Sequence, residues 1–362
     1  MPRAVKIVVV LGTRPEIIKL ASVIRELGDQ AEVVNTGQHY DADMSGVFLK
    51  QLGIPEPKYN LGIGGKTRGA QIARGLEEME ALFRASSPAA VIVQGDTNST
   101  LAGALAANAL GIQLVHVEAG LRSYDRAMPE EHNRVLVDHL SDFLAAGTSG
   151  NLTNLVREGI DASSIEVTGN TVVEAVHAAL PDEASRQQAL ADLRLTPDRF
   201  VLATIHRPEN TDDPVQLAAT LTELGRLGMP VVFPVHPRTR AAIERHGLEA
   251  LLEKFVTTQP LDYQSFLGLA AHAAVIVSDS GGVQEEVTVL KRPLVVVRRS
   301  TERPESLEHF ARIVPPGPTV GEAARAAIED GELLDVLATI PSPFGDGRAS
   351  QRIAERIRAL VA

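Results

Sequence analysis

The sequence predicts an α/β protein with two Rossmann-like parallel-sheet domains that face a cleft. Short apolar runs rich in β-branched residues recur along the chain, and each precedes a stretch of helical composition. The runs are nearly continuous rather than alternating, as expected for strands buried on both faces. The chain also has 362 residues, a length that favours two domains over one.

The predicted strands fall into two series. The first series comprises residues 5–12, 31–37, 89–96, 112–120 and 142–150. The second comprises residues 199–206, 229–236, 273–282 and 293–299. Helical segments of about 10–15 residues follow the strands, and this alternation predicts parallel sheets joined by right-handed crossovers.

A polar, alanine-rich segment at 169–198, which contains two prolines, separates the two series. We therefore expect an N-terminal domain at 1–172 and a C-terminal domain at 173–345. Residues 346–362 follow an amphipathic helical pattern. We expect that helix to return to the N-terminal domain and pack on it.

Composition excludes several classes of function. The formal net charge is −11 and no long basic run occurs, so nucleic acid is not the expected partner. No apolar run approaches the length of a membrane span, and the N-terminus lacks the pattern of a signal peptide. Cysteine is absent, which is consistent with a cytoplasmic protein. No compact spacing of metal ligands occurs, so no metal is expected.

Ionisable residues gather where the predicted strands end. Open α/β sheets bind ligands beyond the carboxyl ends of their strands, so these residues are candidates for a site. Glu118, His206 and His236 each follow an apolar run directly, and Asp96 follows the run "VIVQ" after one glycine. A carboxylate in the position of Glu118 is costly unless it is used or paired.

Each of these residues also has a structural explanation. The "GDTNST" stretch after the third strand could be a helix cap. Glu130 and Glu131 open a helix, and the helix dipole alone would account for one of them. A lone histidine such as His206 or His236 is more often a hydrogen-bonded turn residue. The grouping of all these residues at strand ends favours a functional site.

The stretch "SDSGGVQEE" at 278–286 combines small residues with two glutamates. Small residues at the start of a helix suit a phosphate, because backbone N–H groups there point at the ligand. Neither the three-glycine dinucleotide fingerprint nor a Walker A pattern occurs in the chain. The sequence therefore indicates a phosphate-bearing ligand without a nicotinamide cofactor, and no cofactor is expected.

Seven motifs occur in the order found in one family: "LGTRPE", "GDTNST", "HVEAGLRS", "MPEEHNR", "TIHRPEN", "SDSGGVQEE" and "STERPE". From about residue 7 to residue 305 the chain resembles the non-hydrolysing UDP-N-acetylglucosamine 2-epimerases. The resemblance implies the GT-B architecture, a homodimer, and interconversion of UDP-GlcNAc and UDP-ManNAc as the small-molecule substrates.

The resemblance also implies the site residues. The catalytic set that it implies is Asp96, Glu118, Glu130 and His206, with the histidine near the diphosphate. The set that holds the UDP-sugar is Arg14, Lys19, His236, Ser280, Gly281, Gly282, Glu286 and Arg303. Within this set Glu286 binds the ribose hydroxyls and Arg303 lies on the sugar side.

The proton on sugar C2 is not acidic, so inversion at C2 needs a mechanism other than simple removal and return of that proton. Without a nicotinamide, the remaining route is elimination of UDP to a 2-acetamidoglucal, which requires carboxylates near the sugar and donors around the diphosphate. Two alternatives stay open: a hydrolysing 2-epimerase or GT-B glycosyltransferase acting on a related UDP-HexNAc, and a nucleotide-sugar sensor without turnover.

Overall fold

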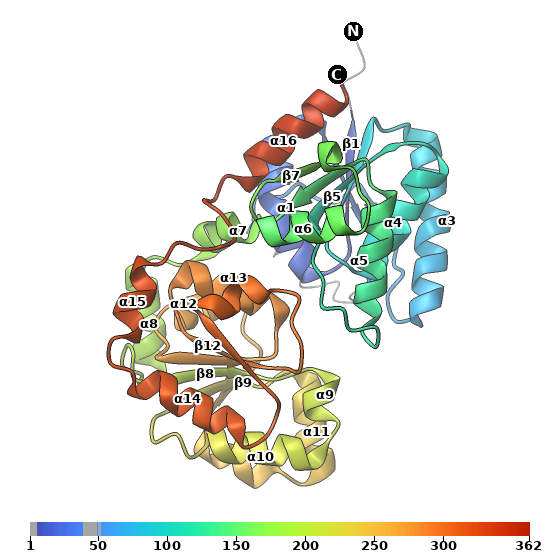
Figure 1. Cartoon of the computed structure of the whole chain (residues 1–362). Coiled ribbons are helices and arrows are strands. Elements are labelled where there is room, and N and C mark those ends of the chain that lie inside the picture. The colour runs from blue at the N-terminus through green and yellow to red at the C-terminus, as the bar shows by residue number, and fades with distance from the viewer. Residues whose placement is uncertain (1–5, 39–48, 50–51) are drawn as a thin grey trace. The chain divides into compact units, whose positions relative to one another are not determined.

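We analysed a computed structural model of the chain, which describes residues 6–38, 49 and 52–362. The chain divides into two compact units. The N-terminal unit comprises Met1–Ala175 together with Phe344–Ala362, and the C-terminal unit comprises Val176–Pro343. Each unit is an α/β fold around its own parallel sheet, as the sequence predicts (Figure 1).

The sheet of the N-terminal unit has the order β3-β2-β1-β4-β5-β6-β7, and its paired strands run parallel. The strands are β1 (Ile7–Leu11), β2 (Ala31–Asn35), β3 (Tyr59–Asn60), β4 (Ala90–Gln94), β5 (Gln113–Ala119), β6 (Phe143–Ala146) and β7 (Ile165–Val167). The order reverses at β1 and β4, which places their ends and the end of β5 at the point where such sheets bind ligands.

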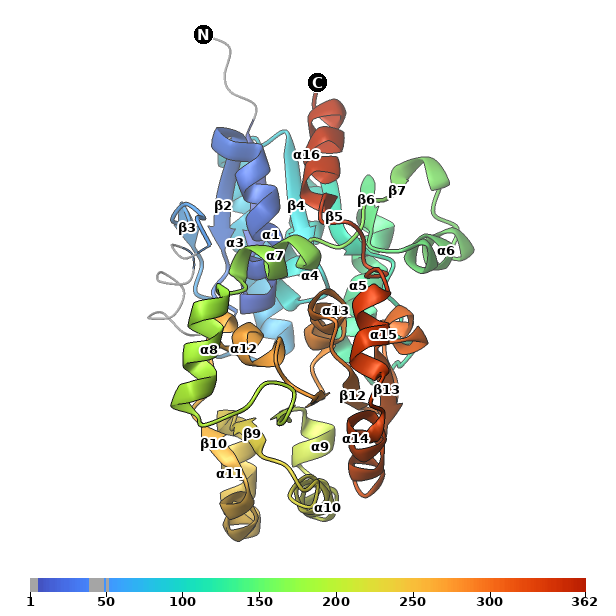
Figure 2. The same ribbon diagram turned by 90° about the vertical axis from the view of Figure 1, so that its left-hand side faces the viewer.

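Helices cover both faces of this sheet (Figures 1 and 2). They are α1 (Arg14–Leu27), α3 (Arg68–Ser86), α4 (Asn98–Ala109), α5 (Pro129–Leu140), α6 (Ser149–Arg157), α7 (Val172–Ala179) and α16 (Ala349–Leu360). On one face, Val8 and Val91 of the strands pack with Met79 and Phe83 of α3 and with Leu101 of α4. These side chains are all buried, so the sheet is fixed against α3 and α4 mainly by apolar contact.

The last helix, α16, belongs to the N-terminal unit and packs against α1. Its apolar stripe is buried at Ile353 and Ile357, and Arg358 donates a hydrogen bond to the carbonyl of Glu26 at the end of α1. The chain therefore leaves the N-terminal unit within α7 and returns to it after Pro343.

The sheet of the C-terminal unit has the order β10-β9-β8-β11-β12-β13, again with parallel pairs. The strands are β8 (Val201–Thr204), β9 (Val231–Pro234), β10 (Val256–Thr258), β11 (Val275–Ser278), β12 (Leu294–Val297) and β13 (Ala311–Val314). The helices are α8 (Glu183–Asp192), α9 (Pro208–Thr211), α10 (Pro214–Leu224), α11 (Pro237–His246), α12 (Tyr263–Ala270), α13 (Gly281–Leu290), α14 (Thr319–Glu329) and α15 (Leu333–Thr339).

Two apolar clusters lie on opposite faces of this second sheet. Val201 and Val275 pack with α10, α11 and α14, whereas Leu202 and Ile276 pack with α8, α12, α13 and α15. Successive strand residues thus enter different cores, which explains the continuous apolar runs in the sequence. Among the residues that the structure describes, no helix is both long and apolar enough to cross a membrane.

Candidate active site

Glu118 occupies an unusual backbone position at the end of β5. The pairing of β5 with β6 shifts register between Val117 and Ala119, and Glu118 at this bulge has a φ of 68°. A non-glycine residue in this left-handed region costs about 1–3 kcal/mol, and such residues cluster at active sites as well as at helix ends. The Glu118 side chain is buried, forms an ion pair with Lys19 of α1, and accepts a hydrogen bond of 2.8 Å from Gln94 Nε2.

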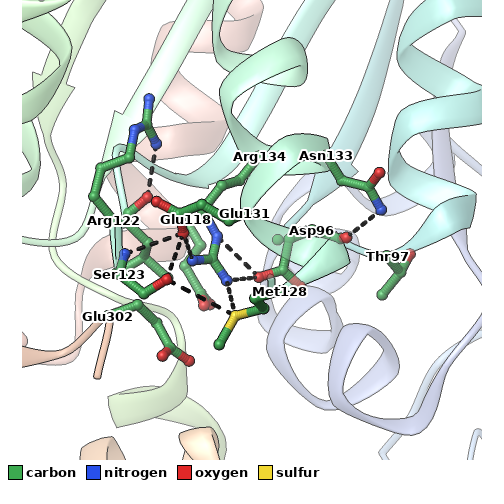
Figure 3. Close-up of polar contacts among 12 residues, drawn as sticks. Asp96, Thr97, Glu118, Arg122, Ser123, Met128, Glu131, Asn133, Arg134 and Glu302 are labelled. Carbon is green, nitrogen blue, oxygen red and sulfur yellow. Dashed lines mark hydrogen bonds and ion pairs between the residues drawn. The ribbon is translucent and has the colours of Figure 1, made fainter. Parts of the chain in front are cut away.

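Asp96 lies in the tight turn that follows β4 (Figure 3). Its side chain is 26% exposed and pairs with Arg134 of α5, whose Nε lies 3.1 Å from Asp96 Oδ2. The backbone carbonyl of Asp96 accepts a hydrogen bond of 2.8 Å from Asn133 Nδ2. Both the carboxylate and the backbone of Asp96 are therefore held by side chains of α5.

The two glutamates in the first turn of α5 have different surroundings. Glu131 is buried, pairs with Arg134, and accepts hydrogen bonds from Ser123 N at 3.0 Å and from Tyr124 N at 2.8 Å. Figure 3 shows this network around Arg134. Glu130 is exposed and has no hydrogen-bond or ion-pair partner among the residues that the structure describes. The structure thus brings Glu131, rather than Glu130, into the network around Asp96.

The turn after β1 is tied to the turn after β4 by Glu16, near the start of α1. Glu16 is buried and accepts hydrogen bonds from Gly12 N at 3.0 Å and from the hydroxyls of Thr97 and Thr100 at 2.8 and 3.1 Å. Burial raises the pKa of the Glu16 carboxyl, and these hydrogen bonds only partly offset that effect. The neighbouring Arg14, the first residue of α1, is half-buried.

In the C-terminal unit, Asp279 at the end of β11 holds His206 at the end of β8. Asp279 is fully buried, and its Oδ1 lies 2.8 Å from His206 Nδ1. Its Oδ2 accepts hydrogen bonds of 2.8 Å from the backbone N–H groups of His206 and Arg207. Burial favours the neutral carboxyl, but His206 and these donors outweigh it and lower the pKa of Asp279 below its ordinary value.

His206 and His236 lie close together beside this carboxylate. Their ring centroids are 5.4 Å apart with the rings tilted by 41°. His236 is the N-cap of α11, where its Nδ1 accepts a hydrogen bond from Arg238 N. His206 Nδ1 faces Asp279, and the side chain is 39% exposed. The Asp279 carboxylate therefore orients His206 with its Nε2 edge directed away from the carboxylate.

The first turn of α13 presents Ser280, Gly281 and Gly282. Ser280 is the N-cap, and a Cβ on Gly281 would lie 2.9 Å from Arg303 Nη1, so only glycine fits there without displacing the arginine. Glu286 lies one turn along the helix and is 8% exposed. The helix thus offers backbone donors at its start and a carboxylate further along.

Glu285 and Arg303 form a buried pair beside this helix. Arg303 Nε lies 2.9 Å from Glu285 Oε1, and Arg303 also pairs with Glu302. Arg303 is 7% exposed and Glu285 is fully buried. The arginine predicted to bind the sugar is thus enclosed by two carboxylates of its own unit.

Sequence reasoning singled out Asp96, Glu118 and Lys19 but assigned no role to the other residues that hold the two carboxylates. Arg134, Asn133 and Gln94 were not predicted as site residues, although the first two lie in the "MPEEHNR" motif. The spacing of Glu131 and Arg134 by three residues on one helix could have revealed their ion pair. Asp279, in "SDSGG", was likewise not predicted.

Two parallel α/β units with ionisable groups at their strand ends are typical of an α/β enzyme. A family model described as UDP-N-acetylglucosamine 2-epimerase matches residues 23–358. The chain belongs to this family, whose members are isomerases.

Individual relatives agree with the family match. The chain is 40% identical to a UDP-N-acetylglucosamine 2-epimerase of Methanocaldococcus jannaschii, over 96% of this chain and 97% of the relative. It is 39% identical to a UDP-2,3-diacetamido-2,3-dideoxy-D-glucuronate 2-epimerase of Pseudomonas aeruginosa, over 98% of this chain and 100% of the relative.

The fold matches solved structures of the same family. One is the Methanocaldococcus jannaschii UDP-GlcNAc 2-epimerase in complex with UDP-GlcNAc and UDP, with a TM-score of 0.85, 38% identity, and coverage of 98% of this chain and 99% of that one. Another is the UDP-GlcNAc 2-epimerase of Neisseria meningitidis bound to UDP-GlcNAc, with a TM-score of 0.87, 31% identity, and coverage of 98% and 100%.

Proposed function

We propose that this chain interconverts UDP-GlcNAc and UDP-ManNAc without hydrolysis. The observation that carries the proposal is the pairing of each inner carboxylate, Asp96 and Glu118, with a cation of the same unit, Arg134 and Lys19. The cation holds each carboxylate in place, and a positioned carboxylate is the kind of group that takes up a proton in such a step. Relatives named for this reaction and a relative bound to UDP-GlcNAc support the choice of substrate.

The reaction that we propose is an elimination followed by a re-addition. A carboxylate removes the C2 proton, the C1–O bond to UDP breaks, and UDP leaves with the electron pair as a C1=C2 double bond forms. A proton is then delivered to the other face of C2, and the β-phosphate oxygen of UDP attacks C1. No water is consumed, and no oxidant is required.

We assign the proton transfers to Asp96, Glu118 and Glu130. Asp96 retains an exposed edge and Glu130 is exposed on the first turn of α5, whereas Glu118 is buried against Lys19. Arg14 and Lys19 are proposed to steady the nucleotide sugar. These assignments rest on the family resemblance together with the surroundings of each group.

We assign UDP binding to the C-terminal unit. The start of α13, with Ser280, Gly281 and Gly282, would bind the diphosphate through its backbone donors. His206 and His236 would lie beside the diphosphate, and Glu286 would accept hydrogen bonds from the ribose hydroxyls. Arg303, held by Glu285 and Glu302, would contact the sugar.

The decisive experiment is incubation with UDP-GlcNAc in deuterated water, followed by NMR of the recovered sugars. We expect deuterium at C2 of both UDP-GlcNAc and UDP-ManNAc, with intact UDP-sugar as the product. Turnover without C2 label would exclude the elimination, and stoichiometric free UDP with free sugar would identify a hydrolysing enzyme. An Asp96→Asn variant should bind UDP and lose the exchange by about 100-fold or more.

The Pseudomonas aeruginosa relative gives a second candidate substrate, a UDP-2,3-diacetamido-glucuronate. The same assay with that sugar decides between the two, because the better substrate has the higher kcat/KM. The family resemblance also leads us to propose a homodimer that works in the cytoplasm. Light scattering on the purified protein tests the dimer.

A further inference from the structure

His116, in the middle of β5, is a fully buried histidine with a polar partner on each ring nitrogen. Its Nδ1 lies 2.6 Å from Asp138 Oδ1 of α5, and its Nε2 lies 2.8 Å from the backbone carbonyl of Gly95. Gly95 precedes Asp96 directly, and His116 is two residues before Glu118. The His116 ring lies on β5, the strand that ends at Glu118, and it contacts the turn that contains Asp96.

The partners of this ring decide which hydrogen bonds it can form. The Gly95 carbonyl can only accept a hydrogen bond, so Nε2 must donate. Asp138 Oδ2 lies 2.7 Å from Arg122 Nη1, and Gly120 N also donates to this carboxylate, so Asp138 is held as an acceptor. Both ring nitrogens of His116 therefore face hydrogen-bond acceptors.

The carboxylates near His116 are themselves held by Arg122. Arg122 pairs on its other side with Glu158, whose Oε1 lies 2.8 Å from Arg122 Nε. Asp138 and Glu158 thus lie on either side of Arg122, and His116 contacts Asp138 through its other oxygen. A buried charge is tolerated only when it is paired and hydrogen-bonded, and here each charge has an opposite neighbour.

This network holds the backbone around both inner carboxylates. The Gly95 carbonyl is bound by His116, and the Asp96 carbonyl is bound by Asn133. On the β5 side, Gly120 N donates to Asp138, which fixes the chain just beyond Glu118. A backbone hydrogen bond of 3.0 Å from Gly95 N to the Val117 carbonyl also joins the Asp96 turn to β5, and His116 and Asp138 add a buried side-chain connection beside it.

We propose that His116, held by Asp138, is a positioning residue that sets the Asp96 turn against the Glu118 bulge for the proton transfers at C2. The proposal rests on the function proposed above, since it takes Asp96 and Glu118 as the reacting carboxylates. Its distinguishing element is the bond to the Gly95 carbonyl, because that bond alone connects the ring to the Asp96 turn.

Two substitutions of His116 test its two hydrogen bonds one at a time. The amide nitrogen of asparagine occupies roughly the place of histidine Nδ1, so His116→Asn can keep the bond to Asp138. The amide nitrogen of glutamine occupies roughly the place of Nε2, so His116→Gln can keep the bond to the Gly95 carbonyl. We expect H116N to lose about 100-fold in kcat for C2 exchange, because a displacement of about 1 Å costs that much.

We expect H116Q to retain most of the wild-type kcat and both variants to keep KM within about threefold, since substrate binding is not altered. His139→Gln is the matched control, because His139 lies on α5 beside Glu158 with its side chain 47% exposed. The H139Q variant should have the kcat and KM of the wild type. Wild-type kcat in H116N, or equal losses in H116N and H116Q at an unchanged melting temperature, would overturn the proposal.

A measurement on the unmodified protein keeps the test independent of activity and of variant folding. Long-range ¹H–¹⁵N correlation spectra report whether each ring nitrogen carries a proton, and the His116 signals are those that disappear in H116Q. We expect both nitrogens to be protonated at pH 7. A neutral tautomer would overturn the proposal, whereas failure of wild-type C2 exchange would overturn only the proposed function.

Discussion

Lys19 and Glu118 form an ion pair in which the side chains are only 6% and 5% exposed. The lysine lies on α1, after the first strand of the sheet, and the glutamate lies at the bulge of β5. The pair therefore connects α1 to the end of β5 between two residues that are 99 positions apart in the sequence. It also compensates a carboxylate that would be costly to bury alone.

Replacing one member of this pair should destabilise the N-terminal unit. Lys19→Met leaves Glu118 buried without its cation, and the loss of one partner from a buried pair costs about 3–5 kcal/mol. Urea unfolding followed by circular dichroism measures the change. Lys6→Met is the control, because Lys6 is half-exposed in its pair with Glu32 and should cost at most about 1 kcal/mol. Equal unfolding midpoints for K19M and K6M would contradict this account.

The adjacent glutamates of α5 should respond differently to substitution. Glu131→Gln weakens the pair with Arg134 and the bonds from Ser123 and Tyr124, so it should lower stability by about 1–3 kcal/mol and reduce kcat. Glu130→Gln alters an exposed side chain and should leave the melting temperature unchanged, while lowering kcat if Glu130 transfers a proton.

Thermal unfolding and C2 exchange, measured on both variants, provide the comparison. Full exchange in the E130Q variant would remove Glu130 from the catalytic set. An E131Q variant that melts with the wild type would show that the network around Arg134 does not depend on that carboxylate.

The lowered pKa of Asp279 predicts a defined loss of stability in acid. Because the folded-state pKa lies below the unfolded value of about 3.9, the ionised carboxylate stabilises the fold fully above that pH. This contribution is lost as the pH falls toward the folded-state pKa. The stability difference between the wild type and Asp279→Asn should therefore shrink as the pH falls below about 4.

A His206→Leu variant removes a group that lowers the pKa of Asp279. The stability of this variant should therefore begin to fall at a higher pH than that of the wild type. Unfolding midpoints in a pH series check both statements. A wild-type minus D279N difference that stays constant down to pH 3 would show that the Asp279 carboxyl has no lowered pKa.

Substitution of Glu285 should mainly lower stability, whereas substitution of its neighbour Glu286 should mainly weaken ligand binding. Glu285→Gln weakens the buried pair with Arg303 and should destabilise the C-terminal unit by about 3 kcal/mol. Glu286→Gln should weaken UDP binding by about tenfold, the effect of one charge-assisted hydrogen bond, with a smaller effect on stability. Isothermal titration with UDP measures the affinity. Wild-type UDP affinity in E286Q would exclude its contact with the ribose.

The sequence predicted the interior of both sheets and missed their edges. The strands that were not predicted are β3, β7, β10 and β13, which are the outermost strands in the two sheet orders. They have two to four residues and are mostly half-buried or exposed. An interior strand needs apolar residues on both faces and so leaves a continuous apolar run, whereas an edge strand does not.

Residue types at strand ends identified candidates for the site, but their pairing depends on contacts distant in sequence. Nothing local to Glu118 indicates the left-handed backbone there or the bond to Lys19. Nothing in the sequence distinguishes His116 from its neighbours in the strand, or Asp138 from the other polar residues of its helix. Only the fold brings them to opposite ends of one hydrogen bond.

The return of α16 to α1 has a consequence for biosynthesis. The N-terminal unit contains both the first strand and the last helix of the chain, while every residue of the C-terminal unit lies between them. On the ribosome, the C-terminal unit can thus be complete while the surface of α1 that Ile353 and Ile357 will cover is still bare. The N-terminal unit begins before the C-terminal unit and is completed after it, so until α16 has been made the nascent chain exposes an apolar surface that a chaperone could bind.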